Sequence, residues 1–197
     1  MRYIDIYRAW QSFVKAKKYS TSIDEFAYYV EQNLQQLTRD TETRTYKHGS
    51  YKRVVISEKK RRDLAVASVC DRVVHRYVYD ELVGIFDNSF EPDVFSCREG
   101  KGLHKALVRT QKLLQKYYEC YVWRADITKF FDYVDQDKLL SIIVRKIDPN
   151  SELFWLCEQI IQSYNSKPSA ISHQPSAISW HPYWQFDVSN FCQHLPK

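Results

Sequence analysis

The apolar residues in the N-terminal part of the chain recur every three or four positions, which is the spacing of one face of an α-helix. They predict two amphipathic helices, over residues 3–18 and about 21–37. The first helix ends in a lysine-rich turn, which suits the negative end of the helix dipole. The apolar faces contain Ile4, Tyr7, Trp10 and Phe13 in the first helix, and Phe26, Tyr29, Val30 and Leu34 in the second.

Two short β-type runs follow, at residues 51–56 and 64–68, and a highly charged turn separates them. This arrangement predicts a β-hairpin with a basic tip. Beyond it, apolar residues recur at helical spacing in several segments. One further segment shows the alternation of apolar and polar residues that is typical of a strand. We expect helices over residues 70–87, 103–117, 135–146 and 151–164, and a strand over residues 119–127. Helices mixed with a few strands indicate an α+β chain.

Composition narrows the class of protein. The 197 residues are 44% hydrophobic, so the chain can bury a core, while four Gly and six Pro are too few for an all-β chain of tight turns. No apolar run is long enough to span a membrane, and the N-terminus lacks the apolar stretch of a signal peptide. Five widely spaced cysteines without zinc-site spacing suggest reduced thiols and a cytoplasmic protein.

Positive charge is concentrated around the predicted hairpin. Residues 44–62 contain eight Lys or Arg and a single acid, Glu58, whereas the whole chain has a net charge of +5. Such a density favours a polyanionic partner. The alternative interpretation is an ordinary solvated hairpin surface.

The segment from Ala125 to Asp132, ADITKFFD, is the strongest candidate for chemistry. A carboxylate at the end of a strand, here Asp126, can hold a divalent cation at the edge of a sheet, and Mg²⁺ completes its shell with phosphate oxygens and water. Two such ions can clamp the attacking and leaving oxygens of a phosphoryl transfer. The alternative is a solvent-facing Asp followed by two core phenylalanines.

Residues 51–164 resemble the fingers and first palm segment of bacterial reverse transcriptases of the group II intron, retron and diversity-generating types. Five blocks carry the resemblance, and they occur in the family's order. They are Lys60-Arg61-Arg62 (basic fingertip), Asp71-Arg72-Val73-Val74-His75 (D-R-[VL]-[VI]-[QH]), Ile85-Phe86 with Phe90 (I-F-x-x-x-F), Ser96-Cys97-Arg98 with Gly100-Lys101-Gly102-Leu103-His104 (S-x-x-R…K-G-[TL]-H, here with one residue rather than two between Ser96 and Arg98), and Asp126 to Asp132 (motif A, D-I-x-x-F-F-D).

The resemblance implies a role for each matching residue. Asp126 would be a catalytic metal ligand of a two-magnesium site, with the backbone carbonyl of Ile127 as a second ligand. Phe131 would be the gate that excludes a ribose 2′-hydroxyl. The incoming nucleotide would be bound by Lys60 and Arg62 at its triphosphate, and Arg98 would lie near the nucleotide or the template.

Plainer interpretations remain open for several of these residues. Arg98 could pair with Glu99 or with a helix end, and the fingertip residues Lys60 and Arg62 could be ordinary charges of a hairpin. Asp71 is expected to cap its helix, and Asp132 to cap or orient the turn of motif A. The histidines His75 and His104 are expected to be packed or on the surface, because no partner has metal-ligand spacing.

The last 33 residues differ in character from the rest. The string PSAIS occurs twice at a spacing of seven, and the sequence after it has no clear periodicity. Codons compatible with residues 180–197, read one nucleotide later, permit GIPIGNLTSQIFANIYL, which resembles motif B of the family and the helix after it. Our hypothesis is that this stretch is translated out of frame; the alternative is a genuine tail.

The predicted organisation is therefore an N-terminal helical segment (1–43), fingers (44–118), the start of a right-hand polymerase palm (119–164) and an aberrant tail (165–197). The expected function is RNA-directed DNA polymerisation with Mg²⁺, RNA template, DNA or RNA primer and dNTPs. The Y-x-D-D motif that completes the metal site does not occur in the 197 residues, so we expect the chain alone to be inactive. The alternatives are a non-catalytic nucleic-acid-binding module and a fragment that needs a second polypeptide.

Overall fold

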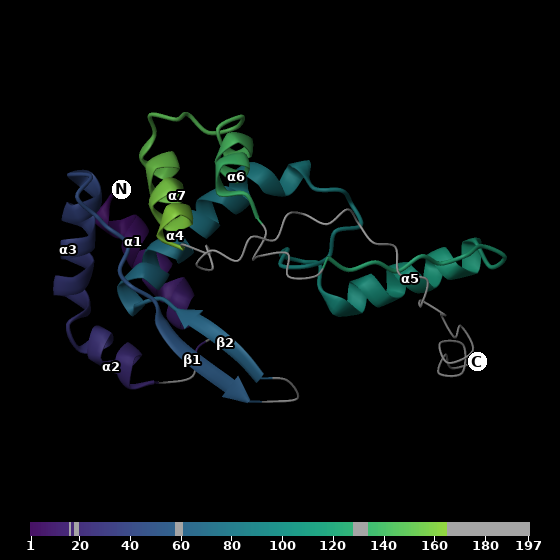
Figure 1. The fold of residues 1–197 in the computed structure, drawn as a ribbon, viewed down its shortest axis with the longest axis horizontal. Coiled ribbons are helices and arrows are strands. Elements are labelled where there is room, and N and C mark those ends of the chain that lie inside the picture. Colours follow the sequence, from purple (N-terminus) through teal and green to yellow (C-terminus); the bar gives the residue numbers. More distant parts are fainter. Residues whose placement is uncertain (16, 18–19, 58–60, 128–133, 165–197) are drawn as a thin grey trace, which may run out of the picture. The chain divides into compact units, whose positions relative to one another are not determined.

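The computed structural model of the chain describes residues 1–15, 17, 20–57, 61–127 and 134–164, and the side chains of residues 61–63 are excluded from that description. It contains helices joined to one small antiparallel sheet, in agreement with the expected α+β class (Figure 1). The elements are α1 (Tyr3–Val14), α2 (Thr21–Tyr28), α3 (Val30–Glu42), β1 (Lys52–Ser57), β2 (Arg61–Val66), α4 (Val69–Phe86), the 3₁₀ turn η1 (Asp87–Ser89), α5 (Leu103–Lys116), α6 (Gln136–Ile143) and α7 (Glu152–Ser163).

The core forms where α1, α2 and α7 pack against α4, and α3 packs against α1 and α2. Helix α4 contributes Val73 and Val74, which are almost completely buried. The ring of Trp10 from α1 lies 4.7 Å from that of Phe26 from α2, centroid to centroid. The helices predicted over residues 70–87, 103–117, 135–146 and 151–164 are confirmed as α4, α5, α6 and α7, with small shifts at their ends.

The single helix predicted over residues 21–37 is wrong, because two helices, α2 and α3, occupy this region. The backbone leaves the helical conformation at Tyr29, where φ is −111° and ψ is 30°. The side chain amide of Asn33 donates a hydrogen bond of 3.1 Å to the carbonyl of Phe26 near this break. A side chain thus satisfies a carbonyl at the end of α2, where helical partners run out.

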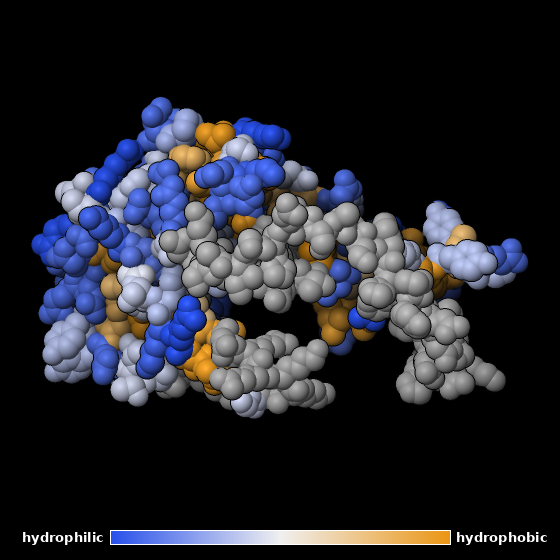
Figure 2. Space-filling view, in the orientation of Figure 1, coloured by the Kyte–Doolittle hydropathy of each residue, from blue (hydrophilic) through white to orange (hydrophobic). Residues whose placement is uncertain are grey.

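The predicted hairpin is confirmed for its two strands. Strands β1 and β2 pair antiparallel, with Lys52 opposite Val66 and Ser57 opposite Arg61. The charged turn between them lies outside the described residues. Every side chain of β1 is exposed, including those of Val54, Val55 and Ile56. Figure 2 shows this apolar surface next to hydrophilic side chains on the hairpin. The hairpin therefore projects from the helices rather than covering their core.

The strand predicted over residues 119–127 is wrong, because residues 121–127 have an irregular backbone. Their side chains are exposed, and those of Tyr121 and Trp123 reach 105% and 83% of full exposure. Alternation of side chains favours a strand, but a strand is stable only when its backbone groups pair with a neighbour. No residue within the described parts of the chain pairs with this segment.

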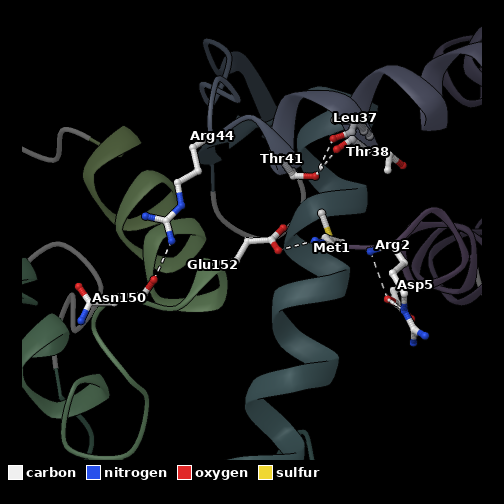
Figure 3. A network of polar contacts seen from close by, with 9 residues as sticks. All are labelled: Met1, Arg2, Asp5, Leu37, Thr38, Thr41, Arg44, Asn150 and Glu152. Atoms are coloured by element: carbon white, nitrogen blue, oxygen red, sulfur yellow. Dashed lines mark hydrogen bonds and ion pairs between the residues drawn. The ribbon is translucent and has the colours of Figure 1, made fainter.

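Polar contacts tie the chain's N-terminus and α3 to the start of α7 (Figure 3). The terminal amine of Met1 forms an ion pair with Glu152. Arg44, just beyond α3, donates a hydrogen bond of 2.6 Å to the carbonyl of Asn150. Within α3, the buried hydroxyl of Thr41 donates to the carbonyls of Leu37 and Thr38, each at 2.9 Å. Segments distant in sequence are therefore held together by hydrogen bonds as well as by the apolar core.

The core predicts a clear contrast between two leucines. Leu34 of α3 is fully buried, whereas Leu107 of α5 is 56% exposed. We expect Leu34→Ala to lower the free energy of unfolding by about 2–5 kcal/mol through lost burial and a residual cavity. Leu107→Ala should change it by less than about 0.5 kcal/mol. Urea unfolding followed by far-ultraviolet circular dichroism measures both, and equal effects would contradict the assignment of the core.

Candidate functional site

The buried carboxylate of Asp71 lies at the centre of a cluster of hydrogen-bonded polar groups. It is 3% exposed, at the first turn of α4. Its Oδ1 accepts hydrogen bonds from the Tyr46 hydroxyl at 2.8 Å and from the Gly49 backbone N–H at 3.2 Å. Its Oδ2 accepts from the Ser68 hydroxyl at 2.7 Å. Asp71 therefore fastens the connection between α3 and β1 to the start of α4.

The expectation that Asp71 caps α4 is wrong, because Ser68 is the capping residue and Asp71 contributes its backbone N–H. Ser68 is the N-cap, and its Oγ accepts a hydrogen bond from the Asp71 backbone N–H at 3.1 Å. A negative charge in the first turn also suits the positive end of the helix dipole. Glycine fits closely at position 49, because a Cβ there would lie 3.0 Å from Oδ2 of Asp71. A larger residue would require the Asp71 carboxylate or the connection to shift by a few tenths of an ångström.

Hydrogen bonding decides the charge state of this cluster. Burial by itself would raise the pKa of Asp71, but the hydrogen bonds from Ser68, Tyr46 and Gly49 outweigh it and lower the pKa below its ordinary value. Burial, together with the neighbouring carboxylate, raises the pKa of the Tyr46 phenol. The carboxylate is therefore charged and the phenol neutral over the ordinary pH range, which is the combination that the hydrogen bond requires.

Two histidines form a second contact between this connection and α4. The Nε2 atoms of His48 and His75 lie 2.9 Å apart, and their rings stack with centroids 5.0 Å apart. The Nδ1 of His48 lies 2.7 Å from the carbonyl of Gly49, so it carries the proton and donates. The contact between the two Nε2 atoms needs one donor and one acceptor, so at least one of the two rings must be neutral.

The histidine pair also joins the start of the hairpin. The ring of Tyr51 stacks on His48 with centroids 4.8 Å apart, and its hydroxyl lies 2.9 Å from that of Ser163. The ring of Tyr164 packs edge-on against the ring of Tyr51, with centroids 5.6 Å apart. The base of the basic hairpin is therefore positioned by α4 and by the end of α7.

Arg98 organises the other end of α4. Its side chain is 12% exposed. Its guanidinium donates to both carboxylate oxygens of Asp87, at 2.7 and 3.1 Å, and to backbone carbonyls of Asp87 and Glu91. The guanidinium also lies 5.7 Å from the centroid of the Phe90 ring. Its acidic partner is Asp87, the C-cap residue of α4, so Arg98 pairs with a helix end and not with Glu99, which were the two plainer interpretations.

The polar loop before α5 has the left-handed backbone that its glycines allow. Gly100 and Gly102 have φ values of 69° and 97°, and Cys97 adopts φ 56° without being a glycine. The Tyr79 hydroxyl donates a hydrogen bond of 3.1 Å to the carbonyl of Cys97, which helps to hold that conformation. The loop is therefore fixed to α4 by side chains from both directions.

The remaining predicted site residues are only partly described. Lys60 and Phe131 lie outside the described residues, as does Asp132, and the side chain of Arg62, on β2, is likewise excluded. Asp126 and Ile127 are described and exposed, within the irregular segment 121–127. Across the described ranges, no hydrogen bond or ion pair joins Asp126 to Arg98, and no group of three or more His, Cys, Asp or Glu side chains has metal-binding geometry.

Sequence reasoning missed the partners of Asp71 and the histidine pair. The spacing of Ser68 and Asp71 was a usable signal for a capped helix. Nothing in the sequence pairs Tyr46 with Asp71 or His48 with His75, because these contacts join residues 25 and 27 positions apart. His75 is half-buried and His104 is exposed, which agrees with the expectation that these histidines are packed or on the surface.

Comparison with protein-family models and with curated proteins finds no match to this chain. Among the helices that the structure describes, each is too short or too polar to cross a lipid bilayer. The four cysteines in these ranges are free thiols. Burial raises the pKa of the Cys70 and Cys157 thiols to about 11.

The histidine pair predicts a pH-dependent stability. Burial, followed by the neighbouring His48, lowers the pKa of His75 from 6.5 to about 4. Arg72 lowers it further, and the Asp71 carboxylate opposes the shift. Between these two pH values the unfolded chain binds a proton at His75 that the folded chain does not bind. The contribution of His75 to the free energy of unfolding therefore decreases as the pH falls from 6.5 to 4.

We expect His75→Gln to remove about 1–2 kcal/mol of this pH dependence, allowing for partial exposure of the ring. Urea unfolding at pH 7 and pH 4.5 measures it. The matched control is His104→Gln on α5, which should keep the wild-type dependence. Asp71 titrates in a lower range, since its pKa lies below the ordinary carboxylate value. If the His75 variant kept the wild-type dependence of unfolding free energy on pH, the assignment of that dependence to His75 would be contradicted.

Proposed function

We propose that the chain is the fingers and first palm segment of an RNA-directed DNA polymerase. In the complete enzyme, a primer 3′-hydroxyl would attack the α-phosphate of a dNTP opposite an RNA template, with Mg²⁺ stabilising the charge. Alone, the chain would bind nucleic acid and polymerise little or not at all. The proposed setting is the cytoplasm, where its thiols stay reduced.

The observation that carries the proposal is the order of five sequence blocks over residues 60–132. Contacts at the two ends of α4 support it. Arg98, the arginine of the fourth block, binds Asp87 and contacts the ring of Phe90. Both residues lie in the I-F-x-x-x-F element, Phe90 as its last residue and Asp87 at a variable position. Asp71, the first residue of the D-R-[VL]-[VI]-[QH] block, holds the connection that leads into the basic hairpin. Blocks separated in sequence are thus physically linked.

The contacts of Arg98 refine its proposed role. Its guanidinium is already occupied by a carboxylate and by backbone carbonyls. The pairing also lowers the pKa of Asp87 below its ordinary value. Arg98 would therefore shape the loop that faces the template or nucleotide, and direct contact with either would require Asp87 to release it.

Asp126 is the proposed metal ligand of this segment, with the carbonyl of Ile127. Both residues are exposed in a stretch of irregular backbone. A single carboxylate holds Mg²⁺ weakly, because the ion needs further oxygen ligands in octahedral geometry. The partner carboxylates of the family belong to a Y-x-D-D motif, which the 197 residues do not contain. This accounts for the proposed lack of activity in isolation.

The second candidate function is a nucleic-acid-binding module without catalysis. The basic hairpin favours this function, because every side chain of β1 is exposed, including those of Lys52 and Arg53. The two candidates differ in the importance of Asp126. A binding module needs only its positive surface, whereas a polymerase also needs the carboxylate.

The proposal predicts weak, salt-dependent binding to an RNA template annealed to a DNA primer. We expect Lys60→Gln with Arg62→Gln to weaken binding about tenfold in 0.1 M salt and to reduce the log–log salt slope by about 1.8, because each duplex phosphate contact contributes about 0.9. Fluorescence anisotropy of a labelled primer measures this. Lys15 and Lys138 are exposed residues outside the hairpin, so Lys15→Gln with Lys138→Gln removes the same charge elsewhere and is the matched control.

Primer extension separates the two candidates. The chain alone should extend little primer, and robust extension by it would refute the proposed inactivity. A chain continued in the shifted reading frame should extend a primer, and Asp126→Ala in that longer chain should abolish extension while leaving binding unchanged. Extension that survives Asp126→Ala would contradict the proposed metal ligand.

A further inference from the structure

Helix α5 carries a concentration of positive charge that neither the hairpin nor motif A accounts for. Between Gly100 and Tyr118 the sequence contains five Lys or Arg and no acidic residue. Four of these cations lie on the helix itself, and all four are exposed. They are Lys105, Arg109, Lys112 and Lys116.

The four cations form a single row. Their positions in the sequence differ by four, three and four residues. At 3.6 residues per turn they fall within an arc of about 60° and extend over about 16 Å of helix axis. The rest of the polar surface, at His104, Gln111 and Gln115, lies outside this arc. We call these four residues the α5 cation row.

The apolar side of α5 lies elsewhere on the helix. Leu103, Leu107, Leu113 and Leu114 centre about 150° away from the α5 cation row by helical geometry. No residue of α5 is fully buried. Figure 2 shows hydrophilic and hydrophobic side chains side by side in the region of α5. A ligand of the row therefore does not have to compete with the apolar side.

Local contacts hold parts of the row in place. Lys105 donates to the carbonyl of Gly100, and Lys116 lies 5.0 Å from the ring centroid of Tyr117. Arg109 is bound by both carboxylate oxygens of Asp93, at 2.8 and 2.9 Å. Both members of that ion pair are about half exposed. Asp93 thus partly neutralises the row.

We propose that the α5 cation row is a second nucleic-acid contact, which binds consecutive phosphates of one strand. One strand of a duplex rises about 3.4 Å along the axis per phosphate while it winds around that axis, so a straight row of about 16 Å can follow roughly two or three consecutive phosphates. Lysine and arginine are the natural ligands of phosphate oxygens. This inference rests on the proposed nucleic-acid function and adds a binding element outside the hairpin.

A nucleic-acid strand suits this arrangement better than an anionic membrane does. A membrane surface attracts the total charge of a helix and gives no advantage to cations in a row. A phosphate backbone is itself a line of charges, so alignment increases the number of simultaneous contacts. The hairpin carries the same excess of positive charge, which gives both elements one kind of partner.

The test uses the full 197-residue chain and fluorescence anisotropy with two labelled probes, a 20-nucleotide poly(U) RNA and a 20-base-pair RNA–DNA duplex. Lys105→Gln with Lys112→Gln should weaken binding about tenfold in 0.1 M salt. The log–log salt slope should fall by about 1.4 for the single strand or about 1.8 for the duplex, given about 0.7 or 0.9 per contact. The probe with the larger loss identifies which form the row binds.

A relocation variant separates alignment from charge. It combines Lys105→Gln and Lys112→Gln with Gln111→Lys and Gln115→Lys, which keeps the charge of α5 but takes two cations out of the row. We expect it to bind as weakly as the double variant. Binding at the wild-type level would overturn the proposal, because total charge would then suffice.

A substitution of opposite sign guards against misfolded variants. Asp93→Asn removes the carboxylate that occupies Arg109, and we expect it to tighten binding severalfold. Unchanged or weaker binding would overturn the proposed contact of Arg109. Vesicles of phosphatidylcholine and phosphatidylserine provide the membrane arm, and loss of vesicle binding without loss of RNA binding in the double variant would also overturn the proposal.

The outcomes for the wild-type chain separate the two levels of inference. If it binds neither nucleic-acid probe, the nucleic-acid function itself fails. If it binds but the substitutions in the α5 cation row have no effect, the proposed function stands and only the row is excluded.

Discussion

The buried carboxylate of Asp71 is the interaction on which the arrangement of the hairpin depends. It is charged, nearly inaccessible and bound by three donors from the adjacent connection and the helix cap. A buried charge is tolerated only when its oxygens are satisfied, so loss of any of these donors would be costly. The base of a hairpin with no buried side chain in β1 is thereby fixed to the helical core.

Arg98 performs the complementary task at the opposite end of α4. A carboxylate in the first turn and a guanidinium beyond the last turn both suit the helix dipole. The 18 residues of α4 span about 27 Å between these two points. The helix therefore works as a spacer that holds the hairpin connection at one end and the loop before α5 at the other, and the proposed binding residues are attached to these two segments.

The sequence predicted elements well where a local pattern, such as the regular spacing of apolar residues on one helix face, defines them. Helices α4, α5 and α7 follow from periodicity alone, and both strands of the hairpin follow from a charged turn between β-type runs. The helix break at Tyr29 depends on Asn33, and the expected strand at 119–127 failed for want of a pairing neighbour among the described residues. The contacts of Asp71, His75 and Arg98 join distant positions, so no local pattern reveals them. The residues of the candidate polymerase site could be predicted from sequence motifs. Among those that the structure describes, polar contacts are seen for Arg98.

The measurement that tests the central proposal most directly is the sequence of the coding DNA, from the codon of Asn165 to several hundred bases past that of Lys197. Read one nucleotide later from Trp180, it should give the motif B string and continue into Y-x-D-D. That result would assign the chain to a polymerase whose frame is interrupted. A shifted frame without these motifs would contradict the polymerase reading and leave the binding module as the better account.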